Sequence, residues 1–222
     1  MSGLLRKILL VAPFAALAAS AGGCAAVAWI VAQTAPPRRY PAKYELPEGK
    51  KVLVFVDDYR QPVNYEPIKE ELARRIAKEF TEHEVAVEII PYERLEDLAY
   101  STRRFREMGI PSVAKKLGAE MVVYVDIRRF SLKESPQSPL WQGRMEVDVK
   151  VVDPEKGTVW PKDRPDGYPV IYADREPSDK LSAGYGVVLA KMVAALTARK
   201  LAKLFYERVE RAKWFGDKED GP

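Results

Sequence analysis

Apolar positions in the middle of the chain follow first the period of a strand and then that of a helix. Lys51–Asp57 (KVLVFVD) is a nearly continuous apolar run, which predicts an interior strand covered on both faces. The apolar residues of the next segment recur at every fourth position: Ile68, Leu72, Ile76 and Phe80. Glu84–Ile90 returns to the alternation of a strand. These segments predict a β-α-β unit with a right-handed crossover.

Further strands and helices follow in the second half of the chain. In order, the patterns predict helical pieces within 91–108, a short helix over Val113–Leu117, strands over Glu120–Ile127, Trp141–Val152, Thr158–Trp160 and Tyr168–Ala173, and a long helix over Tyr185–Phe215. Valines and charged residues alternate in Trp141–Val152, so one face of this strand is expected in solvent. The order β-α-β-α-β-β-β-α predicts an α/β fold of two or three layers with a mixed sheet, half parallel and half antiparallel.

Two segments carry a resemblance to a small domain of bacterial envelope proteins. Leu117–Asp126 reads as leucine, glycine, alanine, acid and strand, and Val149–Val159 reads as a strand, valine-aspartate, a turn, glycine and a strand. In this pattern, residues 50–210 resemble the domain shared by the curli-secretion lipoprotein, the lipoprotein activators of peptidoglycan synthases and the TolB N-terminal domain. The resemblance implies the fold. Those relatives are non-enzymatic assembly and partner-binding modules.

The N-terminus has the pattern of an export signal. Two basic residues precede an uncharged stretch, Ile8–Pro37, that begins with an apolar segment. Small residues then lead through Gly23 to Cys24. This resembles the lipobox of bacterial lipoproteins, in which the cysteine is acylated on sulfur and becomes the first mature residue. The resemblance implies cleavage between Gly23 and Cys24 and attachment to a membrane through acyl chains on Cys24, which is expected to be stable.

An uncleaved transmembrane helix is the alternative for the N-terminus. Ile8–Ala32 has 25 mainly apolar residues, and about 20 are enough to span a bilayer. Pro13 and the two glycines before Cys24 interrupt such a helix, and Arg38 and the arginine after it would lie on the translocated side, against the usual charge bias. Lipidation is therefore favoured. Either anchor leaves the domain on a membrane, facing the periplasm or the outside of the cell.

The chain is expected to have four parts. Residues 1–23 form the signal peptide, and 24–49 carry the acylated cysteine and a proline-rich tether that acts as a semi-rigid spacer. Residues 50–215 form a single mixed α/β envelope domain, and 216–222 form a disordered tail.

Composition excludes several classes of function. The 36 basic residues nearly balance the 32 acidic ones, so no nucleic-acid surface is predicted. A single cysteine excludes an internal disulfide and a thiolate metal site of the usual kind, and His83 is the only histidine. Glycine-rich phosphate-binding loops are missing. No catalytic residue, metal site or cofactor is predicted.

Acidic residues near the ends of predicted strands are candidates for ligand contacts. Asp57 and Asp58 end the first strand and Asp126 lies near the end of the third, where open α/β sheets gather ligands. Carboxylates there could hold a cation, so a cation-dependent enzyme is an alternative function. The competing and favoured interpretation is that Asp57 and Asp58 cap the loop that follows.

Aromatic residues gather in the sequence around the loop at 162–168. Trp141, Trp160 and Tyr168 could form a partner-binding patch. Filling the core beside the sheet is the more frequent role of such residues. The favoured function is a membrane-anchored envelope lipoprotein that binds another envelope protein or associates with itself, without catalysis.

Lipidation predicts a defined mature N-terminus. In the membrane fraction, the intact mass should correspond to a chain that starts at acylated Cys24, and a Cys24→Ser variant should lose that species. Mass spectrometry of the intact chain and of its N-terminal peptide checks this. An intact chain starting at Met1 or Ser2 in both proteins would instead establish a membrane helix over Ile8–Ala32.

Overall fold

A computed structural model describes residues 37–59, 63, 65, 67–86, 88–135, 137–174, 179 and 184–210. Gly23, Cys24 and the predicted tail lie outside these residues. The described chain divides into two units. In the smaller, β1 (Arg38–Tyr40) pairs antiparallel with β8 (Arg208–Glu210), and the guanidinium of Arg208 lies 4.6 Å from the ring centre of Tyr40. The larger unit, residues 41–207, holds the main sheet.

The main sheet has the predicted parallel and antiparallel halves. Its strands are β2 (Lys51–Asp57), β3 (Glu88–Ile90), β4 (Met121–Lys133), β5 (Trp141–Asp153), β6 (Gly157–Trp160) and β7 (Tyr168–Ala173). Both β3 and β4 run parallel to β2, and β5 runs antiparallel to β4. The other edge of β5 is shared, because β7 pairs with its first part and β6 with its end. The mixed α/β fold predicted from the sequence is thereby confirmed.

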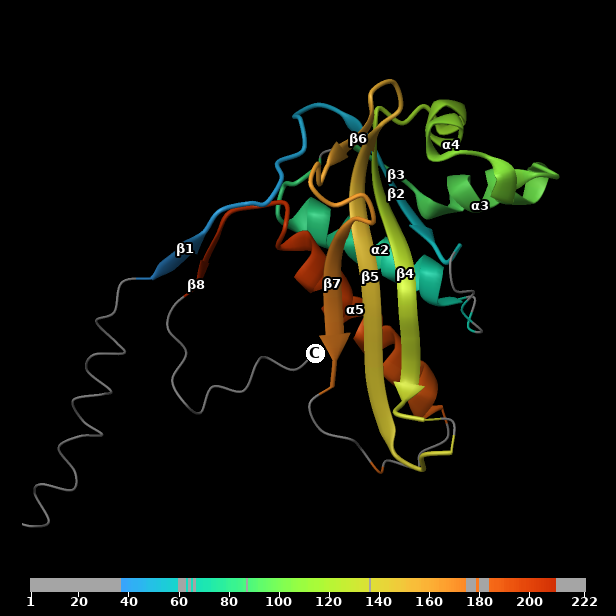
Figure 1. Ribbon diagram of the computed structural model, residues 1–222, viewed down its shortest axis with the longest axis vertical. Helices are drawn as coiled ribbons and strands as arrows, with labels where there is room; N and C mark the ends of the chain where they lie inside the picture. The colour runs from blue at the N-terminus through green and yellow to red at the C-terminus, as the bar shows by residue number, and fades with distance from the viewer. Residues whose placement is uncertain are drawn as a thin grey trace, which may run out of the picture. The chain divides into compact units, whose positions relative to one another are not determined.

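Helices cover the two faces of this sheet unequally. Helices α2 (Pro67–Glu82) and α5 (Tyr185–Ala202) lie together against one face along its length (Figure 1). Within the described residues, the other face is covered over β2, the first part of β4 and the end of β5 by α3 (Tyr92–Ser101), the short 3-10 helix η1 (Phe105–Glu107) and α4 (Ile110–Leu117). None of the helices within the described ranges combines the length and apolar character needed to cross a membrane.

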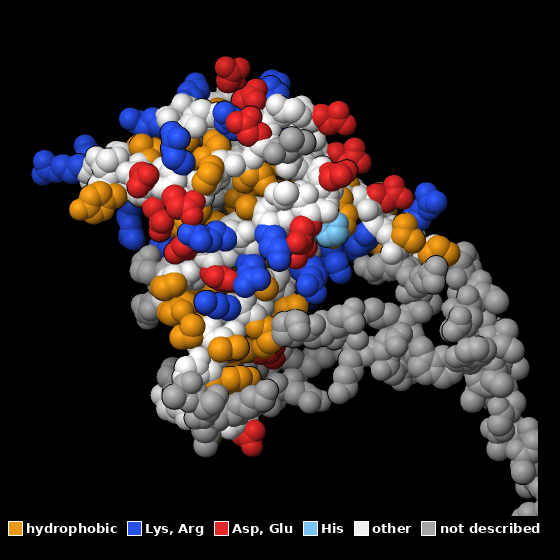
Figure 2. Space-filling model, turned by 180° about the vertical axis from the view of Figure 1, so that it is seen from behind, with side chains coloured by type: hydrophobic (Ala, Val, Ile, Leu, Met, Phe, Trp, Pro, Cys, Tyr) orange, Lys and Arg blue, Asp and Glu red, His pale blue; other side chains and the backbone are white. Residues whose placement is uncertain are grey.

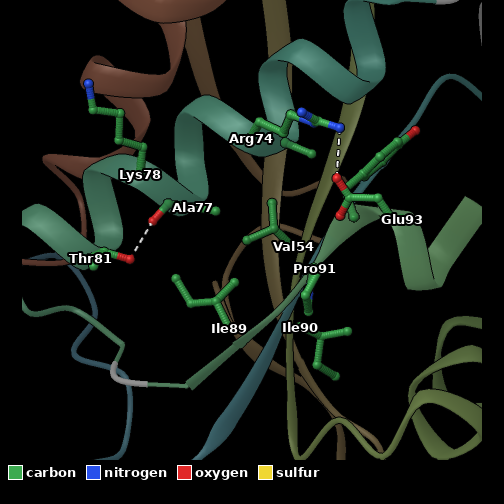
Figure 3. A pocket seen from close by; sticks show the side chains of 11 residues that line it. Val54, Arg74, Ala77, Lys78, Thr81, Ile89, Ile90, Pro91 and Glu93 are labelled. Atoms are coloured by element: carbon green, nitrogen blue, oxygen red, sulfur yellow. Dashed lines mark hydrogen bonds and ion pairs between the residues drawn. The ribbon is translucent and has the colours of Figure 1, made fainter.

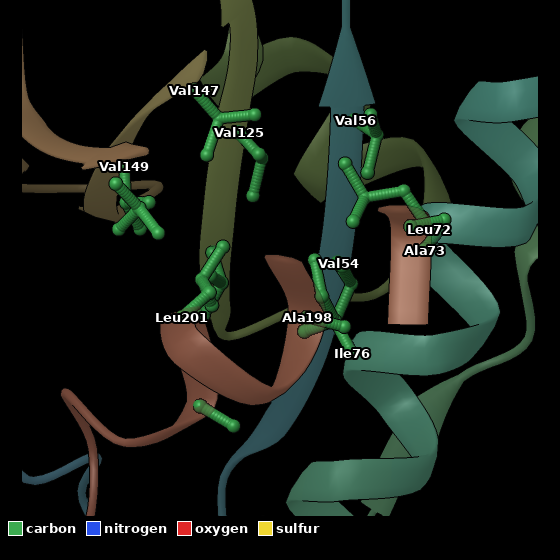
Figure 4. Close-up of a cluster of buried hydrophobic side chains, with 14 of the residues drawn as sticks. Val54, Val56, Leu72, Ala73, Ile76, Val125, Val147, Val149, Ala198 and Leu201 are labelled. Carbon is green, nitrogen blue, oxygen red and sulfur yellow. The ribbon is translucent and has the colours of Figure 1, made fainter. Parts of the chain in front are cut away.

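Strand alternation produces two hydrophobic cores. The larger lies between the sheet and the α2–α5 pair, and Figure 4 shows part of it: Val54, Val56, Leu72, Ile76, Val125, Val147, Val149 and Leu201. The smaller core lies under α3 and α4 and contains Leu53, Phe55, Leu95, Val113 and Val122. Successive residues of β2 therefore enter opposite cores, as expected for a strand that is buried on both faces.

The hairpin between β5 and β6 contains the turn that the pattern of Val149–Val159 indicates. Asp153 accepts hydrogen bonds from the backbone N–H groups of Glu155 and Lys156, at 2.8 and 3.1 Å. These hydrogen bonds lower the pKa of the Asp153 carboxyl from its usual value, and the bond from Glu155 has the largest effect. Gly157 then takes a φ of 82° and begins the returning strand.

The C-terminal helix is shorter than predicted. Helix α5 ends at Ala202, whereas the sequence predicted that it continues to Phe215. Tight turns follow it, and they bury Phe205 against Phe80, with ring centres 5.1 Å apart. The carbonyl of Leu204 accepts hydrogen bonds from two backbone N–H groups of the segment before β2. These contacts between distant segments end the helix, although the local sequence continues its pattern.

Residues 41–49 pack with the larger unit, although the sequence assigned them to the tether. The N–H groups of Lys43 and Tyr44 donate to the carbonyl of Leu204, at 2.7 and 3.1 Å. Leu46 is buried, and the ring of Tyr44 lies 5.9 Å from that of Trp160. The proline-containing segment 41–49 is therefore part of the folded domain, although it forms no helix or strand.

The strand predicted over Glu84–Ile90 is reduced to β3 because α2 ends in a left-handed residue. Glu84 has a φ of 54°, and the N–H of Val85 donates to the carbonyl of Phe80 at 2.8 Å. The N–H of Glu84 donates to the carbonyl of Thr81 at 3.3 Å. These two hydrogen bonds form the Schellman motif that ends many helices, in which the left-handed residue is usually glycine. A side chain at this φ is strained.

Replacing Glu84 by glycine should therefore stabilise the protein. We expect Glu84→Gly to raise the free energy of unfolding by about 0.5 to 1 kcal/mol, because glycine adopts positive φ without the clash of a Cβ. Lys78→Gly, on the exposed surface of the same helix, is the control and should lower it by about 1 kcal/mol. Urea unfolding followed by circular dichroism measures both. A loss of stability in Glu84→Gly would contradict the assigned strain.

Candidate functional site

The part of the sheet that α3 and α4 leave uncovered carries a group of polar side chains, which we call the charged sheet face. It consists of Asp57, Tyr124, Asp126, Arg128, Arg129, Glu146 and Asp148. Strand pairing sets Asp57 opposite Asp126 and Asp126 opposite Asp148. Neighbouring strands lie about 4.8 Å apart, so three aspartates form one row across β2, β4 and β5. The sequence predicted Asp57 and Asp126 as candidates for ligand contacts near the ends of strands; it missed Asp148.

Hydrogen bonds hold the row of aspartates in place. The hydroxyl of Tyr124 donates to Oδ2 of Asp57 at 3.0 Å, and the N–H of Asp58 donates to Oδ1 at 2.8 Å. At the other end, Arg128 donates to Oδ2 of Asp148 at 3.0 Å. Asp126, in the middle, is only 4% exposed. Carboxylates so close together repel each other, and these donors offset that repulsion.

A bulge in β4 brings two arginines to the same face. The register between β4 and β5 shifts between Ile127 and Arg129, so both Arg128 and Arg129 lie beside β5 on the charged sheet face. Arg129 lies 3.8 Å from Glu146. Together with Asp148 these residues line a shallow depression of about 390 Å³. The depression is open and of mixed charge.

Asp58 is separated from the other two predicted acids. Its Oδ2 accepts the N–H of Val63 at 2.9 Å, and its Oδ1 lies 3.3 Å from the ammonium of Lys69 on α2. Asp58 therefore secures the loop after β2 to the α2 side of the sheet, which agrees with the interpretation as a loop cap. Within the described residues, no three histidine, cysteine, aspartate or glutamate side chains are grouped to hold a metal ion.

The predicted aromatic residues lie at two separate places. Trp160 stacks on Tyr168, with ring centres 5.3 Å apart, and both are partly buried against the larger core. Trp141 starts β5, whereas Trp160 is paired with Val151 near its end. This separation along β5 is about 33 Å. The hypothesis of one patch formed by all three residues is wrong, because hairpin pairing places them at opposite ends of a long strand.

Two further hollows lie beside α2. A groove of about 240 Å³ between α2 and the edge strand β3 has an apolar floor that includes Val54 and Ile89 (Figure 3). The ion pair of Arg74 with Glu93, at 2.7 Å, crosses its rim. A wider hollow of about 770 Å³ lies at the C-terminal end of α2, where the imidazole of His83 stacks on Tyr206 with ring centres 4.0 Å apart.

Comparison with known proteins gives likenesses of structure only. No protein-family model and no curated protein matches the chain. The PelC dodecamer from Paraburkholderia phytofirmans is similar with a TM-score of 0.39 and 14% identity, over 77% of this chain and 96% of that chain. Lipoprotein GNA1162 from Neisseria meningitidis is similar with a TM-score of 0.43 and 15% identity, over 68% of this chain and 99% of that chain. Protein XCC0632 from Xanthomonas campestris is similar with a TM-score of 0.44 and 12% identity, over 74% of this chain and 86% of that chain. All three TM-scores lie below 0.5 and carry no argument about function.

The bond between Tyr124 and Asp57 should contribute measurably to stability. Tyr124→Phe keeps the ring that contacts Phe55 and removes only the donor to the carboxylate. We expect the free energy of unfolding to fall by about 1.5 to 3 kcal/mol, the range for a hydrogen bond to a charged group. Tyr100→Phe, at a residue that is 97% exposed, should change it by less than about 0.5 kcal/mol. Equal effects in the two variants, measured by denaturant unfolding, would contradict this role.

Proposed function

We propose that this protein is a bacterial cell-envelope lipoprotein. Its domain is held on a membrane by acylated Cys24, and it binds another envelope protein or further copies of itself without chemistry of its own. The lipobox-like sequence that ends in Cys24 supports the anchor. The charged sheet face carries the proposal of a binding role.

The geometry of this face suits recognition between proteins better than catalysis. Its carboxylates at both ends of the row are already bonded to donors, Asp57 to Tyr124 and Asp148 to Arg128. The adjoining depression is shallow and lined only by charged residues of both signs. Fixed charges in alternation provide a pattern that a partner of complementary charge can match, which gives specificity and a defined orientation.

Reversing one charge on this face should abolish the interaction without unfolding the domain. The side chain of Arg129 is 60% exposed, and its contact with Glu146 is long, at 3.8 Å. We expect Arg129→Glu to reduce the yield of the main crosslinked complex at least ~10-fold, because the new carboxylate repels both Glu146 and the partner's acids. Crosslinking in intact cells with a lysine-reactive reagent, followed by mass spectrometry, measures this yield.

The matched control reverses a charge elsewhere. Lys78 lies on α2 with its side chain 62% exposed. Lys78→Glu should leave the crosslinked complex at the level of the unmodified protein. Thermal unfolding of both variants must show the same transition, so that a loss of crosslinking reports binding. An undiminished complex in Arg129→Glu would show that the charged sheet face is not the binding surface.

A further inference from the structure

Exposed apolar side chains gather at the end of the larger unit that is remote from Trp160. Leu140 is 39% exposed, Val187 46% and Val188 63%. They adjoin the partly buried rings of Trp141 and Tyr185. We call these five residues the apolar end. In Figure 1 it lies at the bottom, where β4 ends, β5 begins and α5 starts, and Figure 2 shows hydrophobic side chains exposed in this region from behind.

The apolar end is held together by close packing. The rings of Trp141 and Tyr185 meet edge to face, with centres 5.8 Å apart. A Cβ added to Gly186 would lie 2.9 Å from Cη2 of Trp141, so the first turn of α5 and the start of β5 are in direct contact. The ammonium of Lys133 lies over the indole, 5.0 Å from the ring centre of Trp141. The exposed Val187 and Val188 therefore lie on a helix turn that is held in place by packing against β5.

The first part of α5 has an unusually low charge for a helix at a surface. Lys191 is the only charged residue from Tyr185 to Ala198. A helix that is apolar on all sides is normally buried. Here α2 and the sheet cover one side, and Val187 and Val188 remain exposed on another. This exposed side is suited to an apolar environment.

We propose that the apolar end docks onto the surface of the phospholipid bilayer to which the N-terminus is attached. The inference rests on the membrane anchor of the proposed function. Tryptophan and tyrosine favour the interface between lipid and water, since their rings are apolar with one polar group. Lys133 and Lys191 are placed to extend their ammonium groups to lipid phosphates while their methylene chains lie along the apolar residues.

The length of chain before the larger unit permits this contact. Seventeen residues run from Cys24 to Tyr40, which can span at most about 56 Å. Tyr44 contacts Trp160 at the opposite end of the larger unit from Trp141, and those two ends are about 33 Å apart along β5. The spacer can therefore bring the apolar end down to the same membrane. Attachment also gives a millimolar effective concentration, so a small patch is sufficient.

Fluorescence quenching by labelled lipids tests the proposal. Acylation occupies the sulfur of Cys24, so a Val188→Cys variant has one free thiol, which is labelled with bimane. The full-length lipidated protein is reconstituted into vesicles of phosphatidylethanolamine and phosphatidylglycerol that contain a nitroxide lipid. We expect quenching at position 188 at least ~3-fold stronger than in a Lys78→Cys control, whose label lies on the exposed surface of α2. Equal quenching at the two positions overturns the proposal.

A second substitution and flotation separate the possible outcomes. Val187→Glu in the Val188→Cys chain should reduce the quenching to the level of the control while the protein still floats with the vesicles. Protein that floats without preferential quenching retains the anchor but overturns the docking. Protein that does not float with the vesicles contradicts the lipid anchor, and it also overturns the docking, which depends on that anchor. Low thiol reactivity at 188 both with and without lipid would identify another copy or segment as the occupant and also overturn it.

Discussion

The packing of three strands against α2 and α5 determines where the polar side chains of the charged sheet face lie. Val56, Val125 and Val147 point from β2, β4 and β5 into this core. Because side chains alternate along a strand, the residue that follows each valine must point to the opposite face. Those residues are Asp57, Asp126 and Asp148, so the row of aspartates follows directly from the burial of the valines.

The unequal cover of the two faces then gives the domain two chemically different surfaces. Among the described residues, helices α3 and α4 cover part of β2, the start of β4 and the end of β5, and the charged sheet face lies beyond them. The long hairpin of β4 and β5 carries Trp141 away from Trp160, so one set of aromatic residues completes the core and the other supports the apolar end. The protein recognition proposed for the charged sheet face and the lipid contact proposed for the apolar end are compatible, because the two surfaces occupy different regions.

Part of the charged sheet face could be predicted from the sequence. Asp57 and Asp126 follow valine-rich runs, and parallel strands bring such positions to the same edge of a sheet. Asp148 also alternates with valines, but only the register between β4 and β5 shows that it lies opposite Asp126. Arg129 is brought to the face by a bulge, and no local pattern indicates where a strand gains an extra residue. Asp58 differs from Asp57 because one step along the chain reverses the direction of the side chain.

From β2 to α5, the sequence by itself determined the type and order of the elements, since the periods of two and 3.6 residues are local properties of the chain. It predicted the interior strand over Lys51–Asp57 and the mixed sheet with its two halves. Only the tertiary structure decided where α5 ends and that residues 41–49 join the domain. Both depend on the turn around Leu204 and Phe205, which contacts Lys43, Tyr44 and Phe80, all more than a hundred residues earlier in the sequence. Local periodicity does not contain such contacts, and their burial outweighs the preference of the chain to continue a helix.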